Sequence, residues 1–201
     1  YPMLQGDLTR ELFPLTDRYG IRVVPIIAPI FVPVKQGAKL TGTPDEEGFS
    51  LLSLQLDRDG EKFAEGMNRR APDPLRPEIK RWVFRCLDEI AEASKRHPSV
   101  GGVGLRVNGK IGLCYIGRDM YRCGQDSGYS EWDIRQFEED TGVQVPRLKP
   151  TPYEWLKEHA WERWIDWRCR RIRDFWLRCR DRLRAANPRW DLWIATDLPS
   201  E

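Results

Sequence analysis

Three apolar runs separated by helical patterns constrain the fold of this chain more than any other feature. They cover residues 21–28 (IRVVPIIA), 100–107 (VGGVGLRV) and 191–196 (DLWIAT). Segments that are apolar along their whole length are typical of parallel strands whose two faces are both covered. Strands that alternate with helices predict a parallel sheet with right-handed crossovers. We therefore expect an α/β fold.

Helix start and stop signals divide the rest of the chain. A helix over residues 7–19 should end at Gly20, because glycine suits the left-handed backbone that closes a helix. A second helix over 78–96 follows Pro77, a residue favoured in the first helical turn. A third, over 130–139, has Ser130 as its N-cap. On the first helix, Leu8, Leu12 and Leu15 share one face.

The last helical pattern is the longest. Thr151-Pro152-Tyr153-Glu154 has the residues of a capping box, and apolar spacing continues to about residue 186. A continuous helix of about 35 residues would be about 52 Å long, which is more than a compact domain needs. We therefore expect a break near His159-Ala160.

Composition and charge exclude several classes of protein. The chain has 33 basic and 31 acidic side chains, for a net charge of +2, which argues against a strongly cationic nucleic-acid domain. No apolar run approaches the about 18 residues of a membrane span. Five cysteines without a Cys-x-x-Cys pair argue against a zinc site and favour reduced thiols, and only two histidines are present. We expect no metal, no cofactor and no membrane partner.

The first residue, Tyr1, bears on the compartment. Because the chain opens without an initiator methionine, we expect a processed or trimmed protein. The compartment stays open between the cytoplasm and secretion after loss of a signal peptide.

Two long excursions, residues 29–77 and 108–150, each follow a predicted strand and precede a predicted helix, whereas the connections into strands are short. Barrel enzymes build their sites from the loops that follow strands. This asymmetry favours a β/α barrel over an open sheet, and no glycine-rich nucleotide-binding motif is present. We predict a single domain over residues 1–201 that forms a partial TIM (β/α) barrel.

Four segments resemble a known family. They are PDPLRP at residues 72–77, VGGVGLRV at 100–107, GYSEWDIRQFEEDTGVQVP at 128–146 and WLKEHAWERWIDWRCRRIRDFWLRCRDRLRAANP at 155–188. Together they are similar to barrel glycoside hydrolases, particularly the family 42 β-galactosidase-like and related hydrolase-like proteins, over residues 70–197. The resemblance implies a carbohydrate partner, and makes the three apolar runs similar to the third, fourth and fifth strands of a barrel.

The chain departs from that family at its catalytic motif. Where the family carries Asn-Glu after the fourth strand, with the glutamate as acid/base, this chain has Asn108-Gly109, and the strand of the nucleophile would lie beyond Glu201. The resemblance therefore implies the middle part of a barrel. The remaining segments would come from a longer parent protein or from another chain, such as a second copy.

Glycosidases need two carboxyl groups, about 5 to 9.5 Å apart, with one kept protonated. Asp126 is our first candidate because it lies in an aromatic, polar segment of the kind that stacks sugar rings, and Asp119 and Asp197 also follow strands. The plainer reading is that these aspartates organise turns. Arg106, near the end of an apolar strand, should meet a carboxylate or a ligand. The predicted substrate-binding residues are Arg106, Asn108, Tyr115, Tyr129 and Trp132.

An alternative function is a non-catalytic interaction or scaffold domain. Residues 163–189 hold ten of the 25 arginines, interleaved with tryptophans, and a basic aromatic helix can contact a protein or a nucleic acid. The spacing of its apolar side chains favours a core-facing stripe instead, which makes nucleic acid the weaker candidate. The stripe comprises Trp161, Trp164, Ile165, Arg168, Ile172, Phe175, Trp176, Cys179 and Leu183.

Overall fold

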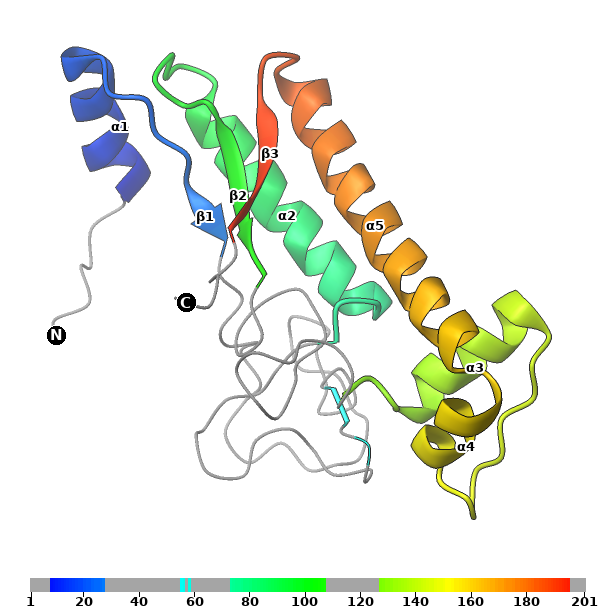
Figure 1. Ribbon diagram of the computed structural model, residues 1–201. Coiled ribbons are helices and arrows are strands. Elements are labelled where there is room, and N and C mark those ends of the chain that lie inside the picture. Colours follow the sequence, from blue (N-terminus) through cyan, green and yellow to red (C-terminus); the bar gives the residue numbers. More distant parts are fainter. Residues whose placement is uncertain (1–7, 28–54, 57, 59–72, 108–126, 196–201) are drawn as a thin grey trace, which may run out of the picture.

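The computed structural model describes residues 8–27, 55–56, 58, 73–107 and 127–195 (Figure 1). These residues form mixed α/β structure. The elements in chain order are α1 Leu8–Tyr19, β1 Ile26–Ile27, α2 Pro77–Ser94, β2 Gly102–Arg106, α3 Glu131–Thr141, α4 Pro152–His159, α5 Trp161–Ala186 and β3 Asp191–Ala195.

The sheet has its three strands in the order β1-β2-β3, and both strand pairs are parallel, as the apolar runs predict. Helix α2 connects β1 to β2, and α5 connects β2 to β3 (Figure 1). Both helices pack on the same face, where their apolar side chains form one core with alternate residues of β2. The buried side chains of this core include Ile79, Val83, Leu87, Val103, Leu105, Phe175, Cys179 and Leu183.

The partial TIM barrel that we predicted is wrong. A barrel closes only when strand number, tilt and register agree, and its inward side chains fill the interior in layers. In the described residues the sheet has three strands, and its face away from α2 and α5 is open: Ile26 is 56% exposed and Trp193 51% exposed. Both side chains flank Gly104 in register. Loop placement and motif similarity carried the barrel prediction, and neither determines whether a sheet closes.

β1 is shorter than predicted. Val23 forms an isolated bridge to Val100, and the carbonyl of Pro25 accepts a hydrogen bond from Gly104 at 2.8 Å, so regular pairing begins only at Ile26. Proline has no N–H to donate to a ladder, which interrupts the strand at this position.

At the start of β2, Gly102 has φ +143°, and an added Cβ would lie 2.1 Å from the backbone oxygen of Asp191. Only glycine allows β2 and β3 to approach so closely there.

The break in the last helical segment is confirmed. α4 ends at His159 and α5 begins at Trp161, with Ala160 between them at φ −148° and ψ 25°. Thr151 and Glu154 form the expected capping box at the start of α4, and Pro77 opens α2. The free energy of these caps is local, so the sequence signals were sufficient to place them.

The buried face of α1 is not the one that carries Leu12 and Leu15. Phe13 and Thr16 are buried, whereas Leu12 and Leu15 are 40% and 50% exposed. Phe13 meets the ring of His97 edge-on at 5.4 Å, and the hydroxyls of Thr16 and Ser99 are 2.9 Å apart. The helix is thus oriented by the turn that follows α2, a contact about 80 residues away in the chain. Helical periodicity alone could not select that face.

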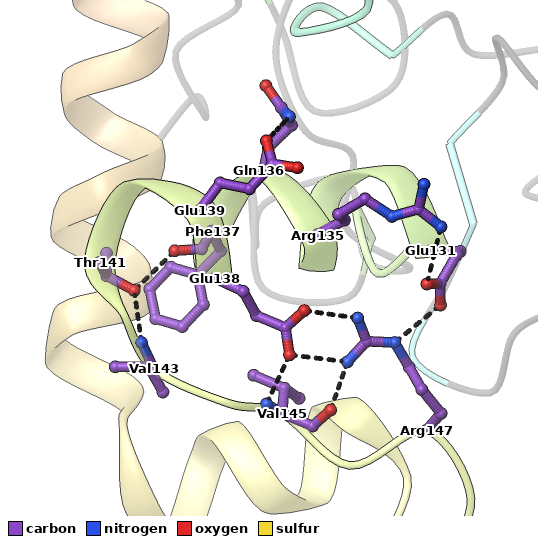
Figure 2. Close-up of polar contacts among 10 residues, drawn as sticks. All are labelled: Glu131, Arg135, Gln136, Phe137, Glu138, Glu139, Thr141, Val143, Val145 and Arg147. Carbon is purple, nitrogen blue, oxygen red and sulfur yellow. Dashed lines mark hydrogen bonds and ion pairs between the residues drawn. The ribbon is translucent and has the colours of Figure 1, made fainter.

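An ion-pair network holds the connection from α3 to α4 (Figure 2). Arg147 lies between Glu131 and Glu138, with N···O distances of 2.8 and 2.6 Å, and it also contacts the carbonyl of Val145. The amide of Val145 in turn donates to Glu138 at 2.7 Å. The hydrogen bond from Arg147 is the main cause that lowers the pKa of Glu138. These contacts fold residues 142–147 back along α3.

A second apolar core lies beside the first half of α5. Phe137 of α3, Leu156 of α4, and Trp164 and Trp167 of α5 are buried together, and their rings meet edge-on or stacked at about 5 to 6 Å. Trp167 also donates through Nε1 to Asp140 at 2.6 Å. Helices α3 and α4 thereby pack beside the start of α5 (Figure 1).

Two of the described cysteines, Cys169 and Cys179, are free thiols, in line with the expectation of reduced cysteines. Within the described ranges, no group of three or more metal-ligating side chains is assembled. No helix in that part of the chain has the length and hydropathy needed to cross a membrane.

Candidate functional site

The segments that follow β1 and β2 come together. The hydroxyl of Ser127 donates to Oε1 of Gln55 at 2.6 Å, and the amide of Gly128 donates to the carbonyl of Leu56 at 2.7 Å. Because α2 and α5 lead back to the amino ends of β2 and β3, their own first residues lie toward the carboxyl ends of the strands (Figure 1). Parallel α/β sheets bind ligands at that edge.

Six polar side chains near these segments are buried. We call them the polar cluster; none is more than 7% exposed. Burying polar groups costs free energy unless they find partners, so such a group of side chains needs a structural or chemical reason. The members are Gln55, Asp73, Ser127, Ser130, Asp133 and Arg168.

Arg168 connects α5 to this cluster. Its NH2 donates to the carbonyl of Ser127 at 2.9 Å, and its guanidinium lies 5.5 Å from the ring centroid of Trp164. An arginine on the core-facing stripe of a helix is stabilised by such hydrogen bonding and cation–π contact. The helix therefore holds the backbone of the second excursion close to its own buried face.

Asp73 and Asp133 place two carboxyl groups in this interior. Asp73 Oδ1 accepts from the amide of Leu75 at 2.9 Å just before α2 begins, and Asp133 forms the capping box of α3 with Ser130. Burial first, and then the negative charge of Asp133, raise the pKa of Asp73 well above its ordinary value. Asp73 therefore keeps its proton to a higher pH than an exposed aspartate does.

Lys80 lies in the first turn of α2, at the edge of the same region. Burial, followed by the positive charge of Arg171, lowers its pKa to about 8, and the charge of Asp73 opposes this shift. A lysine and a carboxyl group with opposite pKa perturbations, close together at the end of a sheet, are the kind of pair found at functional sites.

Three of the predicted substrate-binding residues lie in the described structure. Tyr129 is buried between Tyr153 and Trp164, with ring centroids 5.3 and 5.7 Å away. Trp132 is half-buried beneath the guanidinium of Arg76 at 5.3 Å. Arg106 ends β2 and is half-buried. Tyr129 belongs to the second apolar core and Trp132 packs against it. Contact of either residue with a substrate stays a prediction.

The other predicted site residues lie outside the described residues. These are the carboxylates Asp119, Asp126 and Asp197, together with Asn108 and Tyr115. Their roles stay predictions.

Sequence reasoning missed Asp73, Asp133 and Lys80 as members of one site. In the sequence, Asp133 lies in the first turn of the helix predicted over 130–139, Asp73 lies in the proline-rich segment before α2, and Lys80 lies in the first turn of α2. The sequence does show that Asp73 and Asp133 lie at the starts of helices that follow long excursions. It does not show that the starts of these two helices lie close together.

No protein-family model matches the chain, and neither the curated proteins nor the solved structures give a significant match. The similarity to glycoside hydrolases accordingly rests on the motifs in residues 70–197.

Proposed function

We propose that this chain is a carbohydrate-active protein that binds glycosidic substrates at the carboxyl ends of its strands and hydrolyses them. The observation that carries the proposal is the contact between the two excursions at Gln55 and Ser127. The same polar cluster holds the buried carboxyl group of Asp73, whose pKa is raised. Open α/β sheets gather their ligands at this edge. The substrate class comes from the similarity of four segments to glycoside hydrolases.

In this proposal the buried carboxyl groups and the candidate catalytic carboxyl groups have different roles. Glycoside hydrolysis needs one protonated carboxyl and one carboxylate on either side of the scissile bond. Asp73 and Asp133 are fully buried, so we assign them as positioning residues that set the starts of α2 and α3 against each other. Asp126 is the first candidate for catalysis, with Asp119 or Asp197 as the second carboxyl group.

The test is turnover and binding on a panel of nitrophenyl glycosides and oligosaccharides. We expect release of nitrophenol from at least one glycoside, and a loss of at least about a hundredfold in kcat for Asp126→Asn with binding retained. Asp181→Asn is the matched control, because Asp181 is exposed on α5 and pairs with Arg180 at 2.7 Å. Absence of hydrolysis across the panel, or equal activity of Asp126→Asn and wild type, contradicts the catalytic proposal.

The interaction-domain alternative has less support from α5. Its indoles at Trp164 and Trp167 are buried in the core. Several of its outward guanidiniums are engaged by carboxylates of the same chain, and these ion pairs reduce the positive potential that a phosphate backbone would meet. The pairs are Arg170–Asp166, Arg171–Asp140, Arg173–Asp174, Arg180–Asp181, Arg182–Asp88 and Arg184–Asp191. Salt-dependent RNA binding by the wild-type chain would reverse this ranking.

A further inference from the structure

A cavity of about 350 Å³ lies at the amino ends of the strands, opposite the edge discussed above. Its walls come from the turn between α2 and β2, the turn between α5 and β3, and Arg22. Both turns lie together at the top of Figure 1. A cavity of this size is large enough for a small organic ligand.

The lining of this cavity is basic. Arg22, Lys95, Arg96 and Arg189 line it, and among the described residues no carboxylate does. Lys95 is neutralised by an ion pair with Glu92. The other three cations form no ion pair with any carboxylate in the described ranges.

Two helix ends oppose part of this charge. α2 and α5 both end here, and each C-terminus carries the equivalent of about half a negative charge. Against three unpaired guanidiniums, these two ends leave an excess of about two positive charges. His97 also lines the cavity, but its Nδ1 lies 2.6 Å from Oδ2 of Asp17. The other oxygen of that carboxylate, Oδ1, accepts from the amide of Ser99 at 2.9 Å. The cavity is therefore matched to a dianion rather than a neutral ligand.

Ser94 provides an independent observation. It lines the same cavity, is 1% exposed, and its hydroxyl has no hydrogen-bond partner among the described residues. A buried hydroxyl without a partner costs free energy, and most such groups in proteins are satisfied. An oxyanion in the cavity would accept this hydrogen bond.

We propose that this cavity binds a small organic phosphate. Arginine presents planar, paired N–H donors that match a phosphate, and a phosphate monoester carries nearly two negative charges at neutral pH. Trp190, which is buried and lines the cavity, supplies an apolar wall for the organic part. The volume of about 350 Å³ matches a small organic ligand rather than a nucleic-acid strand.

Arg22 is positioned by its neighbour. Its Nε lies so close to Gly101 that an added Cβ would be only 2.3 Å away. Gly101→Ala would therefore move the guanidinium without changing the charge of the protein. The variant therefore tests whether binding depends on the position of the Arg22 guanidinium and not only on its charge.

The direct test is calorimetric titration of the full chain with phenyl phosphate, using phthalate as a dicarboxylate of similar size and phenol as the neutral control. We expect saturable binding of phenyl phosphate that weakens with salt, weaker binding of phthalate, and none of phenol. Arg96→Gln and Arg189→Gln should each weaken binding about ten- to a hundredfold, and Gly101→Ala should weaken it as well.

Two control variants make the test selective. Arg180→Gln removes the same charge from α5, outside the cavity lining, and should change affinity less than about twofold. Ser94→Ala should weaken binding several-fold while leaving the ligand-free protein at least as stable, because its hydroxyl has no partner there. The proposal is overturned by the absence of saturable binding, by a preference for phthalate, or by equal effects of Arg180→Gln and Arg189→Gln.

Discussion

The hydroxyl of Ser127 donates a hydrogen bond to Oε1 of Gln55 at 2.6 Å, and both side chains are fully buried although they are 72 positions apart in the chain. This bond joins the segment that follows β1 to the segment that follows β2. It is reinforced by the backbone of Leu56, whose carbonyl accepts from Gly128. A long-range polar contact thus holds these two segments together.

Removing that hydroxyl should destabilise the protein measurably. Ser127→Ala leaves the buried amide of Gln55 without this donor, and we expect the free energy of unfolding to fall by about 1–3 kcal/mol. Urea unfolding followed by circular dichroism measures the change. Leu148→Ser is the control, because Leu148 is exposed and its replacement should change stability by less than about 0.5 kcal/mol. Equal midpoints for Ser127→Ala and wild type would show that the contact is not formed in solution.

The raised pKa of Asp73 predicts a specific pH dependence. Its pKa in the folded protein lies above the ordinary value of 3.8, so the folded state binds more protons than the unfolded state above that pH. Stability therefore falls as the pH rises from about 3.8 toward the folded pKa. Asp73→Asn cannot ionise and keeps an acceptor for Leu75. Urea midpoints between pH 4 and pH 8 should decline less in this variant, and parallel declines would contradict the assignment.

The core between α2, α5 and the sheet should respond strongly to cavities. Leu87→Ala removes a fully buried side chain, and we expect a loss of about 2–5 kcal/mol in the free energy of unfolding. Leu177→Ala makes the same chemical change on α5 at a position that is 37% exposed, where the loss should stay below about 1 kcal/mol. A similar cost at both positions would be inconsistent with the packing of α2 on the sheet.

The Glu138–Arg147 pair predicts local protection of the α3–α4 connection. Glu138→Gln removes the charge that Arg147 binds, and the amide of Val145 should then exchange its hydrogen faster. Because the folded pKa of Glu138 is lowered, the contribution of the pair is present at neutral pH and is lost as the pH falls through the folded pKa. The global cost should be roughly 1 kcal/mol or less, since Arg147 is partly exposed. Glu139→Gln, on the exposed side of α3, should leave exchange at Val145 unchanged.

Local signals in the sequence predicted most element boundaries. Ser130 and Thr151 cap their helices through their own side chains, and the break after His159 follows from helix length. Each of these interactions spans only a few residues, so the sequence contains all of its participants. The three parallel strands were also visible as apolar runs, although Pro25 shortened the first of them.

Long-range contacts decided the rest, because their free energy depends on side chains that only the fold brings together. Nothing in the spacing of α1 shows that Phe13, rather than Leu12, packs against His97. The order of residues in the sequence likewise does not show that the buried carboxyl groups of Asp73 and Asp133 interact. The sequence by itself determined where helices and strands form, through caps and periodicity. Tertiary packing alone decided that the described strands form a three-stranded sheet with one open face, since sheet closure depends on the number and tilt of strands rather than on any local signal.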